Sequence, residues 1–259
     1  MNIKLQHKNA LVCGSSQGIG KSIAMEFAES GANVTLLARN REALELVLKE
    51  LNNDGTQKHS YICSDIADIE SIESEIKKRK ESYDILVNNT GGPAPGILHE
   101  AKTEDLETAF KNHIIAAQRL ALMLVQEMKE KKFGRILNII SVGLKQPIMN
   151  LGISNTIRGA MGSWAKTLAS ELGPFGITVN NILPGYTNTE RLNHLFEHRS
   201  KIENVSIEEV KAGIVNEVPA KRLGEPNEIG YLACFLASEN ASYINGINLP
   251  IDGGFLRTL

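Results

Sequence analysis

Several protein classes are excluded by what this sequence has little of. It contains three cysteines, Cys13, Cys63 and Cys234, which are odd in number and far apart, so they fit neither a disulfide framework nor a metal site. We expect reduced thiols in the core of a cytoplasmic protein. No apolar run reaches the roughly 18 residues of a membrane-spanning helix, and residues 1–10 lack the apolar segment of a signal peptide. We therefore expect neither export nor a membrane partner.

An excess of charge of either sign is also missing. Lysine and arginine number 28 against 30 aspartates and glutamates, which leaves a formal net charge of -2 and no long basic run. A nucleic-acid partner is therefore not indicated. The 259 residues, of which 42% are hydrophobic, are enough to form one sizeable core. We interpret residues 1–259 as a single domain, because no repeat or low-complexity linker divides them.

Short apolar runs alternate with longer helical patterns along the chain. This alternation is typical of a parallel sheet, whose strands are buried on both faces and joined by crossover helices. We predict an α/β fold, a Rossmann-type doubly wound parallel sheet of about seven strands with helices on both faces. Strands are predicted at 9–13, 33–38, 58–63, 84–88, 134–140, 177–183 and 246–251, and helices at 18–30, 40–53, 68–80, 103–131, 152–172 and 226–238.

Two of the predicted helices, 103–131 and 152–172, are apolar on more than one side. The main stripe of the first comprises Phe110, Ile114, Ala117, Ala121, Leu124 and Met128, and that of the second Ile157, Met161, Trp164, Leu168 and Leu172. Leu122 and Val125 lie off the first stripe. A helix that is apolar on two sides must bury both, so we expect a homo-oligomer, a dimer or tetramer, packed through these helices. The alternative is that the segment 187–218 covers the second face.

A glycine-rich string follows the first predicted strand and opens the first predicted helix. Gly14 permits a tight turn, Gly18 lets the backbone approach a pyrophosphate, and Gly20 lets helix and strand pack closely. The free N–H groups and dipole of the helix then favour phosphate. The spacing G-x-x-x-G-x-G is a weak signal alone, but its position between strand and helix predicts nucleotide binding. The same loop supplies the candidate cofactor contacts Ser16, Gln17 and Ile19.

The end of the second predicted strand bears on which dinucleotide is bound. A site for NAD would place an acidic residue here to accept a hydrogen bond from the ribose 2′-hydroxyl. No acid appears before Glu42, whereas Arg39 can pair with a 2′-phosphate through its planar fork. We therefore predict NADP(H) as the cofactor and regard NAD(H) as the weaker alternative.

Further motifs follow the loop in order along nearly the whole chain. They are Asp65-Ile66, Asn88-Asn89-Thr90-Gly91, Asn112, Ser141, Pro184-Gly185 followed by Thr187 and Thr189, and Asn245-Gly246 to Asp252-Gly253-Gly254. This succession resembles the short-chain dehydrogenase/reductase family. The most similar members look like 3-oxoacyl-[acyl-carrier-protein] reductases, in a subgroup with an imperfect catalytic tetrad.

The resemblance implies roles for these residues around a bound cofactor. Asp65, with Ile66 beside it, is expected to contact adenine. The turn formed by Asn89, Thr90 and Gly91 is expected to lie beside the ribose. The Pro184-Gly185 loop would hold the nicotinamide carboxamide, with Thr187 and Thr189 completing the cofactor-binding set.

The catalytic positions depart from the family pattern. Asn112 and Ser141 match its Asn and Ser, but the Tyr and Lys positions are occupied by Ser154 and Arg158. A phenol whose pKa is lowered by lysine can protonate a forming alkoxide, and an aliphatic hydroxyl is a far poorer acid. Arg158 can stabilise an oxyanion or bind ribose but does not exchange protons near neutrality. The usual proton donor is therefore missing.

Three other residues are weaker candidates for that donor. Lys145 follows Ser141 in the same loop, and Tyr186 lies on the expected nicotinamide loop, although a solvated lysine and a packed tyrosine are the simpler interpretations. His113 is expected to face another side of its helix than Asn112. A further pattern, His194 to His198, matches the H-x-x-E-H of some zinc proteases, but we expect no metal site there, because it falls in the substrate-covering segment and lacks a third ligand.

Two hypotheses for function remain open from the sequence. The first is an NADP(H)-dependent oxidoreductase that reduces a carbonyl, with 3-oxoacyl compounds among the candidates, or oxidises the matching alcohol with a non-standard proton donor. The second is a catalytically impaired NADP(H)-binding sensor or partner protein. The retained Asn112 and Ser141 favour the enzyme, with a small-molecule substrate.

Overall fold

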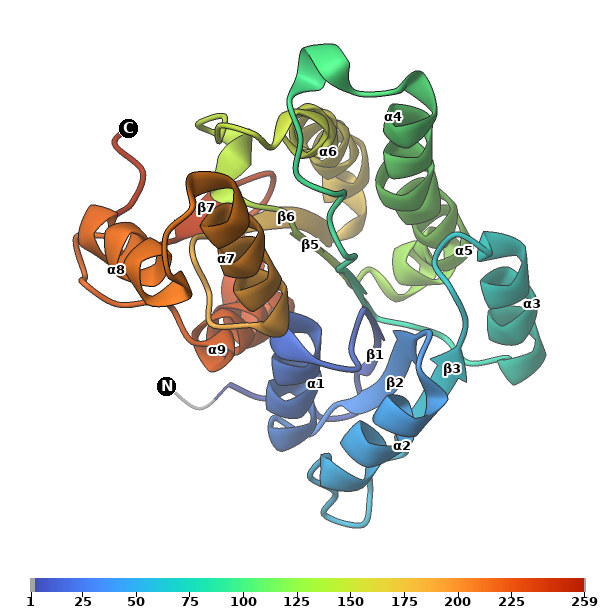
Figure 1. The fold of residues 1–259 in the computed structure, drawn as a ribbon. Helices are drawn as coiled ribbons and strands as arrows, with labels where there is room; N and C mark the ends of the chain where they lie inside the picture. Colours follow the sequence, from blue (N-terminus) through green and yellow to red (C-terminus); the bar gives the residue numbers. More distant parts are fainter. Residues whose placement is uncertain (1–2, 259) are drawn as a thin grey trace.

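The protein, seen in a computed structural model that describes residues 3–258, is built around one parallel sheet. Its strands lie in the order β3-β2-β1-β4-β5-β6-β7 (Figure 1). The chain order reverses between β1 and β4, and in open α/β sheets ligands bind outside the carboxyl ends of the strands at such a point. The strands are β1 (Asn9–Cys13), β2 (Asn33–Ala38), β3 (Ser60–Cys63), β4 (Ile85–Asn88), β5 (Gly134–Ile139), β6 (Ile177–Pro184) and β7 (Asn248–Ile251).

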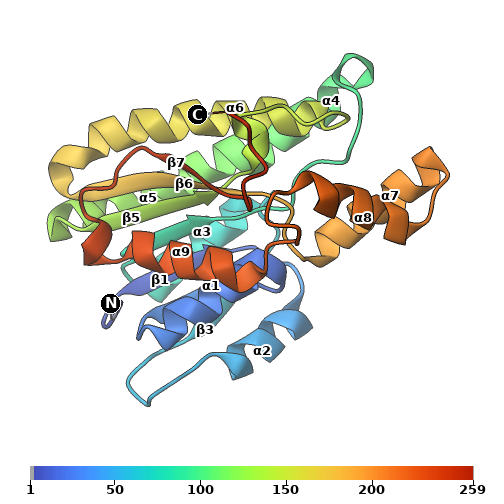
Figure 2. The ribbon, with the colours of Figure 1, turned by 90° about the vertical axis from the view of Figure 1, so that its left-hand side faces the viewer.

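Helices cover both faces of the sheet, as Figure 2 shows from the side. One apolar core joins the sheet to α1 (Gly18–Glu29), α2 (Arg41–Glu50) and α9 (Pro226–Ala237). A second core joins the opposite face to α3 (Ile69–Arg79), α5 (Ala116–Lys131) and α6 (Gly152–Leu172). The predicted fold class is confirmed, and the predicted element bounds differ from the observed ones by only a few residues at most ends.

The predicted helix 103–131 is not regular along its length. It consists of α4 (Thr103–Phe110), a π-helical turn (Lys111–Ile115) and α5. A π turn inserts one residue into the helical repeat and changes which side chains share a face. Phe110, placed on the buried stripe by a regular repeat, is therefore 42% exposed, while Ile114 further along is buried. The turn also carries Asn112, and such turns are frequent at functional sites.

Four asparagines, three of them buried, cross the sheet at one register. The Nδ2 group of Asn88 donates to Oδ1 of Asn138 at 2.8 Å, and Asn138 donates in the same way to Asn181 at 2.8 Å. Asn181 then donates to Oδ1 of Asn248 at 2.7 Å. Each buried amide is thus paired, which avoids the cost of an unsatisfied polar group. This ladder fixes β4 to β7 in register directly below the candidate site.

The segment 187–218 forms two helices, α7 (Glu190–Glu203) and α8 (Ile207–Glu217). Leu192 and Phe196 of α7 pack with Val210 and Ile214 of α8 in a small core of their own. Figure 2 places this pair beyond the carboxyl end of the sheet, away from α5. The alternative in which this segment covers the second apolar face of the long helix is therefore wrong, and Leu122 on that face is 66% exposed.

Candidate active site

The glycine-rich loop forms a cradle that only glycine fits. Gly14 and Gly18 have φ of +60° and +55°, a region that side chains rarely adopt. A Cβ on Gly20 would lie 2.1 Å from the carbonyl oxygen of Gly14 and 2.6 Å from Nδ2 of Asn89. Asn89 in turn donates to the carbonyl of Gly14 at 3.1 Å. The loop and the end of β4 are thus held in close backbone contact.

The first turn of α1 is open toward the same space. Its N-cap residue, Gln17, makes no side-chain cap hydrogen bond. N–H groups of a helix start that lack side-chain caps, together with the helix dipole, attract phosphate. Ser16 and Gln17 lie on the accessible side of the loop, whereas Ile19 packs against the core. The residues present therefore fit a dinucleotide pyrophosphate.

The expected adenosine end of this cradle is charged. Nη1 of Arg39, just after β2, lies 3.4 Å from Oδ2 of Asp65, just after β3, and the Arg39 side chain is 78% exposed. An exposed pair of this kind contributes little to stability, so the guanidinium is free to meet a 2′-phosphate. Ile66, next to Asp65, lines the interior pocket described below.

The loop that follows β6 closes the other side of the cradle. A Cβ on Gly18 would lie 3.4 Å from Cγ2 of Thr189, and the Thr189 side chain caps α7 by accepting from the N–H of Leu192. Gly185, after Pro184, lies so close to Asp252 that a Cβ would be 2.7 Å from the Asp252 Cβ. Thr187 donates to the Gly185 carbonyl at 3.2 Å. The structure thus brings the predicted phosphate and nicotinamide loops together.

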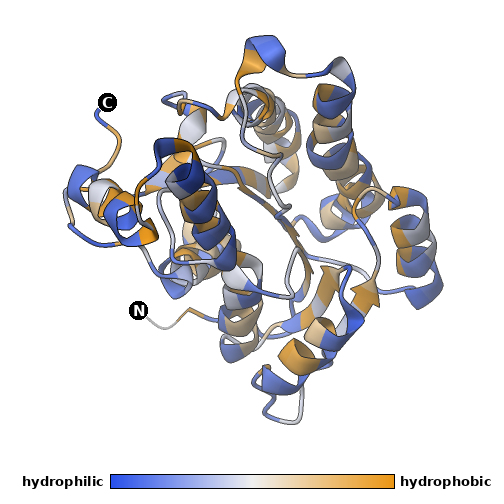
Figure 3. Cartoon of the chain, viewed as in Figure 1, coloured by the Kyte–Doolittle hydropathy of each residue, from blue (hydrophilic) through white to orange (hydrophobic). Residues whose placement is uncertain are grey.

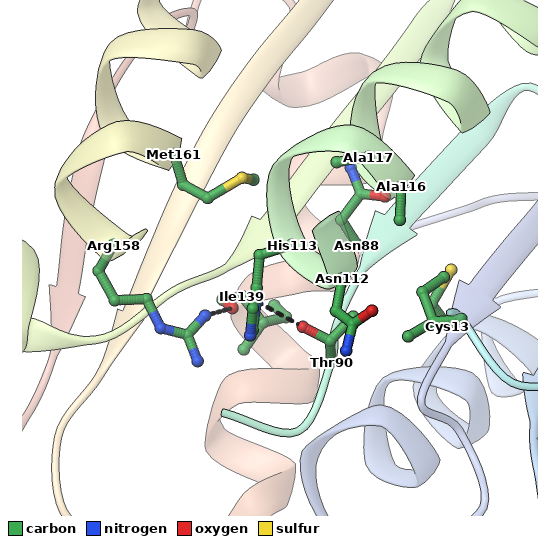
Figure 4. Close-up of a pocket in the computed structure, with 11 residues that line it drawn as sticks. Cys13, Asn88, Thr90, Asn112, His113, Ala116, Ala117, Ile139, Arg158 and Met161 are labelled. Carbon is green, nitrogen blue, oxygen red and sulfur yellow. Dashed lines mark hydrogen bonds between the residues drawn. The ribbon is translucent and has the colours of Figure 1, made fainter. Parts of the chain in front are cut away.

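A small pocket lined by both polar and apolar side chains lies at the carboxyl ends of β4 and β5, beside the cradle. Figure 4 shows Arg158 from α6 on one side of His113, with Asn112 and Thr90 on the other. Two of its polar atoms are buried without a hydrogen-bond partner, Oδ1 of Asn112 and Nε of Arg158. Unpaired buried polar atoms are costly and call for a ligand or water. Of the four predicted catalytic residues, Asn112 and Arg158 line this pocket.

Arg158 is a buried cation with little compensation. It is 8% exposed, and Nη1 donates to the carbonyl of Ile139 at 3.2 Å. Burial, and then the charge of Arg191, lower the pKa of the Arg158 guanidinium to about 10. It therefore remains charged at neutral pH and can stabilise negative charge that develops in the pocket.

His113 faces the pocket, so the prediction that it faces another side of the helix than Asn112 is wrong. The π turn is the physical reason, because it rotates adjacent residues relative to a regular helix. Nδ1 of His113 lies 2.6 Å from Oγ1 of Thr90. Burial, followed by the charges of Arg158 and Arg191, lowers the pKa of His113 to about 3. The ring is therefore neutral at physiological pH. The spacing of residues in the sequence alone does not indicate that His113 lines the pocket.

The other two predicted catalytic residues lie outside the lining of this pocket. Oγ of Ser141 accepts from the N–H of Gly143 at 3.1 Å and lies near Asn155 of α6. Ser154 is half-buried on α6, one turn before Arg158. Lys145 is exposed, and the Tyr186 ring packs edge-on against Phe255 at 5.2 Å between centroids. Burial raises the pKa of the Tyr186 phenol, which makes it a weaker acid.

The three cysteines lie on β1, β3 and α9, and the His194 to His198 pattern lies on α7. Cys13, Cys63 and Cys234 are free, and burial raises the pKa of the Cys13 thiol to about 12. His194 contacts Glu197 at 3.3 Å on α7. Across residues 3–258, no group of three or more His, Cys, Asp or Glu side chains could hold a metal ion. Over the same range, no helix combines the length and apolarity needed to cross a membrane.

The sheet, the glycine cradle and the pocket beside it define a Rossmann-type dinucleotide-binding protein. A family model described as enoyl-(acyl carrier protein) reductase matches residues 14–256. The chain belongs to the short-chain dehydrogenase/reductase family, which confirms the resemblance found in its motifs.

Named relatives cover the chain almost end to end. NADPH-dependent reductase BacG of Bacillus subtilis (strain 168) is 30% identical over 98% of this chain and 100% of its own length. The 3-oxoacyl-[acyl-carrier-protein] reductase FabG of Escherichia coli (strain K12) is 33% identical over 97% and 98%. The crystal structure of L-sorbose reductase from Gluconobacter frateurii, complexed with NADPH and L-sorbose, superposes with a TM-score of 0.93 at 31% identity and full coverage of both chains. The NADP(H) prediction agrees with these relatives.

Proposed function

We propose that this chain is an NADP(H)-dependent oxidoreductase that reduces a carbonyl, with 3-oxoacyl compounds among the candidates, or oxidises the matching alcohol. The observation that carries the proposal is the pair of buried, unpartnered atoms, Asn112 Oδ1 and Arg158 Nε, which belong to two residues that line one pocket beside the cradle. Buried polar atoms of this kind are kept where a ligand satisfies them. A sensor that only binds the dinucleotide would not need them.

The predicted cofactor residues form three groups, each of which would bind a different part of the dinucleotide. The loop from Gly14 to Gly20, with Ser16, Gln17 and Ile19, would hold the pyrophosphate. Arg39, Asp65 and Ile66 would hold the adenosine end. Asn89, Thr90 and Gly91, with the loop of Pro184, Gly185, Thr187 and Thr189, would hold the nicotinamide half.

The chain's own side chains would prepare the carbonyl for reduction. When bound, NADPH supplies a hydride. Asn112 would orient the substrate, the hydroxyls of Ser141 and Ser154 would donate hydrogen bonds to it, and the positive charge of Arg158 would favour an anionic substrate beside the carbonyl. We propose that the proton comes through a hydroxyl or an ordered water, because no phenol or lysine lines this pocket.

The proposal is tested by following NADPH absorbance with a panel of ketones that includes 3-oxoacyl thioesters. Turnover that Ser141→Ala reduces at least about 100-fold supports the enzyme, since loss of a positioned hydrogen-bond donor has effects of this size. Ser242→Ala, at an exposed position far along the chain, is the matched control and should leave the rate unchanged. Saturable NADPH binding with no turnover on any carbonyl would contradict the proposal.

The dependence of the reaction on pH is a second expected result. His113 and Arg158 have pKa values of about 3 and about 10, so neither changes charge between pH 5 and 9. We expect kcat/KM for carbonyl reduction to be flat between about pH 5.5 and 8.5. Initial rates corrected for NADPH decay measure this. A limb with a midpoint inside that range would contradict this expectation and show that another titrating group takes part in the reaction.

We also propose that the chain forms a homo-oligomer through the outer faces of α5 and α6. Leu122 of α5 and Ile115, just before α5, remain 66% and 40% exposed, and a helix with two apolar faces buries both. Light scattering on the purified chain should give a dimer or tetramer, and a mass near 28.3 kDa would rule this out.

A further inference from the structure

Two arginines from different elements converge on Gly92, beside the pocket that Arg158 lines. Arg158 comes from α6, and Arg191 comes from the first turn of α7. A Cβ on Gly92 would lie 3.3 Å from Nη2 of Arg158 and 2.6 Å from Nη2 of Arg191. The two terminal nitrogens are therefore at most about 6 Å apart, a separation at which like charges repel appreciably.

Neither guanidinium has a counterion. Arg158 donates to the carbonyl of Ile139, and Arg191 donates to the carbonyls of Gly92 and Pro93 at 3.0 and 3.3 Å. Within residues 3–258, no carboxylate forms an ion pair with either arginine. The only other titratable side chains lining the pocket are His113, which is neutral, and the Cys13 thiol.

This arrangement is unfavourable without an anion. A buried charge costs several kcal/mol unless it is paired, and a second cation nearby adds to that cost. Arg158 is more than nine-tenths buried, and its Nε has no partner. An anion between the two arginines would satisfy that atom and neutralise the repulsion. The guanidinium fork matches a carboxylate, which it can bind through two parallel hydrogen bonds.

We propose that Arg158 and Arg191 form a carboxylate-binding subsite, and that the substrate is an oxo acid or the matching hydroxy acid. This rests on the proposed reductase function, and it specifies the class of substrate. Arg158 belongs to the body of the fold and Arg191 to the substrate-covering pair α7 and α8. A carboxylate held by both arginines would therefore draw the largely hydrophilic helix α7 (Figure 3) against the pocket.

The subsite is tested by calorimetric binding to the NADP⁺-saturated protein, without turnover. The probes are 2-oxopentanoate and 4-oxopentanoate, with pentanamide as the neutral comparison. At least one oxo acid should bind about 30-fold or more tightly than pentanamide, as expected for charge-assisted hydrogen bonds. Arg191→Gln and Arg158→Met should each remove most of that preference. Arg199→Gln is the matched control, because Arg199 lies on the same helix and pairs with Glu203 at 2.9 Å.

Thermal unfolding separates loss of the subsite from loss of the fold. Arg158→Met removes an uncompensated buried charge, so its melting temperature without ligand should equal or exceed that of the wild type. Arg191→Gln provides a second variant at an exposed position. Equal binding of the oxo acids and pentanamide, or an unchanged preference in both variants, would overturn the proposal. So would a loss of NADP⁺ affinity in Arg191→Gln as large as its loss of oxo acid affinity, which would assign the arginine to the cofactor.

The same data distinguish this proposal from the reductase itself. Oxo acids that bind selectively but are never reduced would leave the subsite standing and contradict the reductase. If neutral ketones are reduced but no oxo acid binds selectively, the reductase stands and the carboxylate-binding subsite is contradicted.

Discussion

Replacing Gly20 with alanine is expected to weaken NADPH binding by about 100-fold or more. The new Cβ would lie 2.1 Å from the carbonyl oxygen of Gly14 and 2.6 Å from Asn89 Nδ2, so the loop must move away from β4. The phosphate cradle depends on this close approach of helix and strand. Titration followed by NADPH fluorescence measures the affinity.

Two further variants keep this result interpretable. Gly213→Ala, on α8, places a methyl group where no atom lies within 4 Å and should leave binding unchanged. Gly18→Ala forces alanine into a φ of +55° with its nearest neighbour at 3.4 Å. The Gly18→Ala variant should fold, although its stability is expected to fall by about 1–2 kcal/mol. It should bind NADPH more weakly than the wild type, because its Cβ would lie where the backbone is expected to approach the pyrophosphate. Wild-type affinity in folded Gly18→Ala and Gly20→Ala would place the cofactor elsewhere.

The stability of the protein is expected to fall steeply in acid because of His113. The pKa of this buried imidazole is about 3, against an ordinary value of 6.5 for the unfolded chain. Between pH 6.5 and pH 3, His113 is therefore protonated in the unfolded chain but stays neutral in the folded chain. The stability that depends on a neutral His113 is fully present above pH 6.5 and is lost as the pH falls toward 3, and the loss amounts to roughly 5 kcal/mol.

Urea unfolding at pH 7 and pH 4 measures this effect. His113→Gln can keep a hydrogen bond to Thr90 but has no proton to gain, so its free energy of unfolding should change much less between the two pH values. His198→Gln, at an exposed position on α7, should follow the wild type. Parallel losses in wild type and His113→Gln would show that the ring is not held neutral by burial.

The sheet and the cradle could be predicted from the sequence because their signals are local. The run from Asn9 to Cys13 and the helix from Gly152 to Leu172 have the observed bounds, since buried strands and long helices leave strong apolar patterns. The positive φ of Gly14 and Gly18 likewise agrees with the roles inferred from glycine spacing.

The centre of the pocket could not be predicted, because its geometry depends on contacts between distant segments. The sequence predicts a regular helix at Asn112 and His113, whereas the structure has a π turn there and both residues line one pocket. The sequence did not indicate a role for Arg191 in the site, because its contact with Gly92 joins residues that are 99 positions apart. The asparagine ladder was also missed, because an Asn within a strand acquires this meaning only when the strand register is known.

The central claim is that the cradle between β1, α1 and β4 holds NADP(H) with Arg39 at its adenosine end. Calorimetric titration of the wild type and of Arg39→Ala with NADPH and with NADH tests it most directly. We expect saturable binding of one NADPH per chain, at least about 10-fold tighter than NADH, with the difference largely lost in Arg39→Ala. If neither dinucleotide binds the wild-type chain, the account is contradicted.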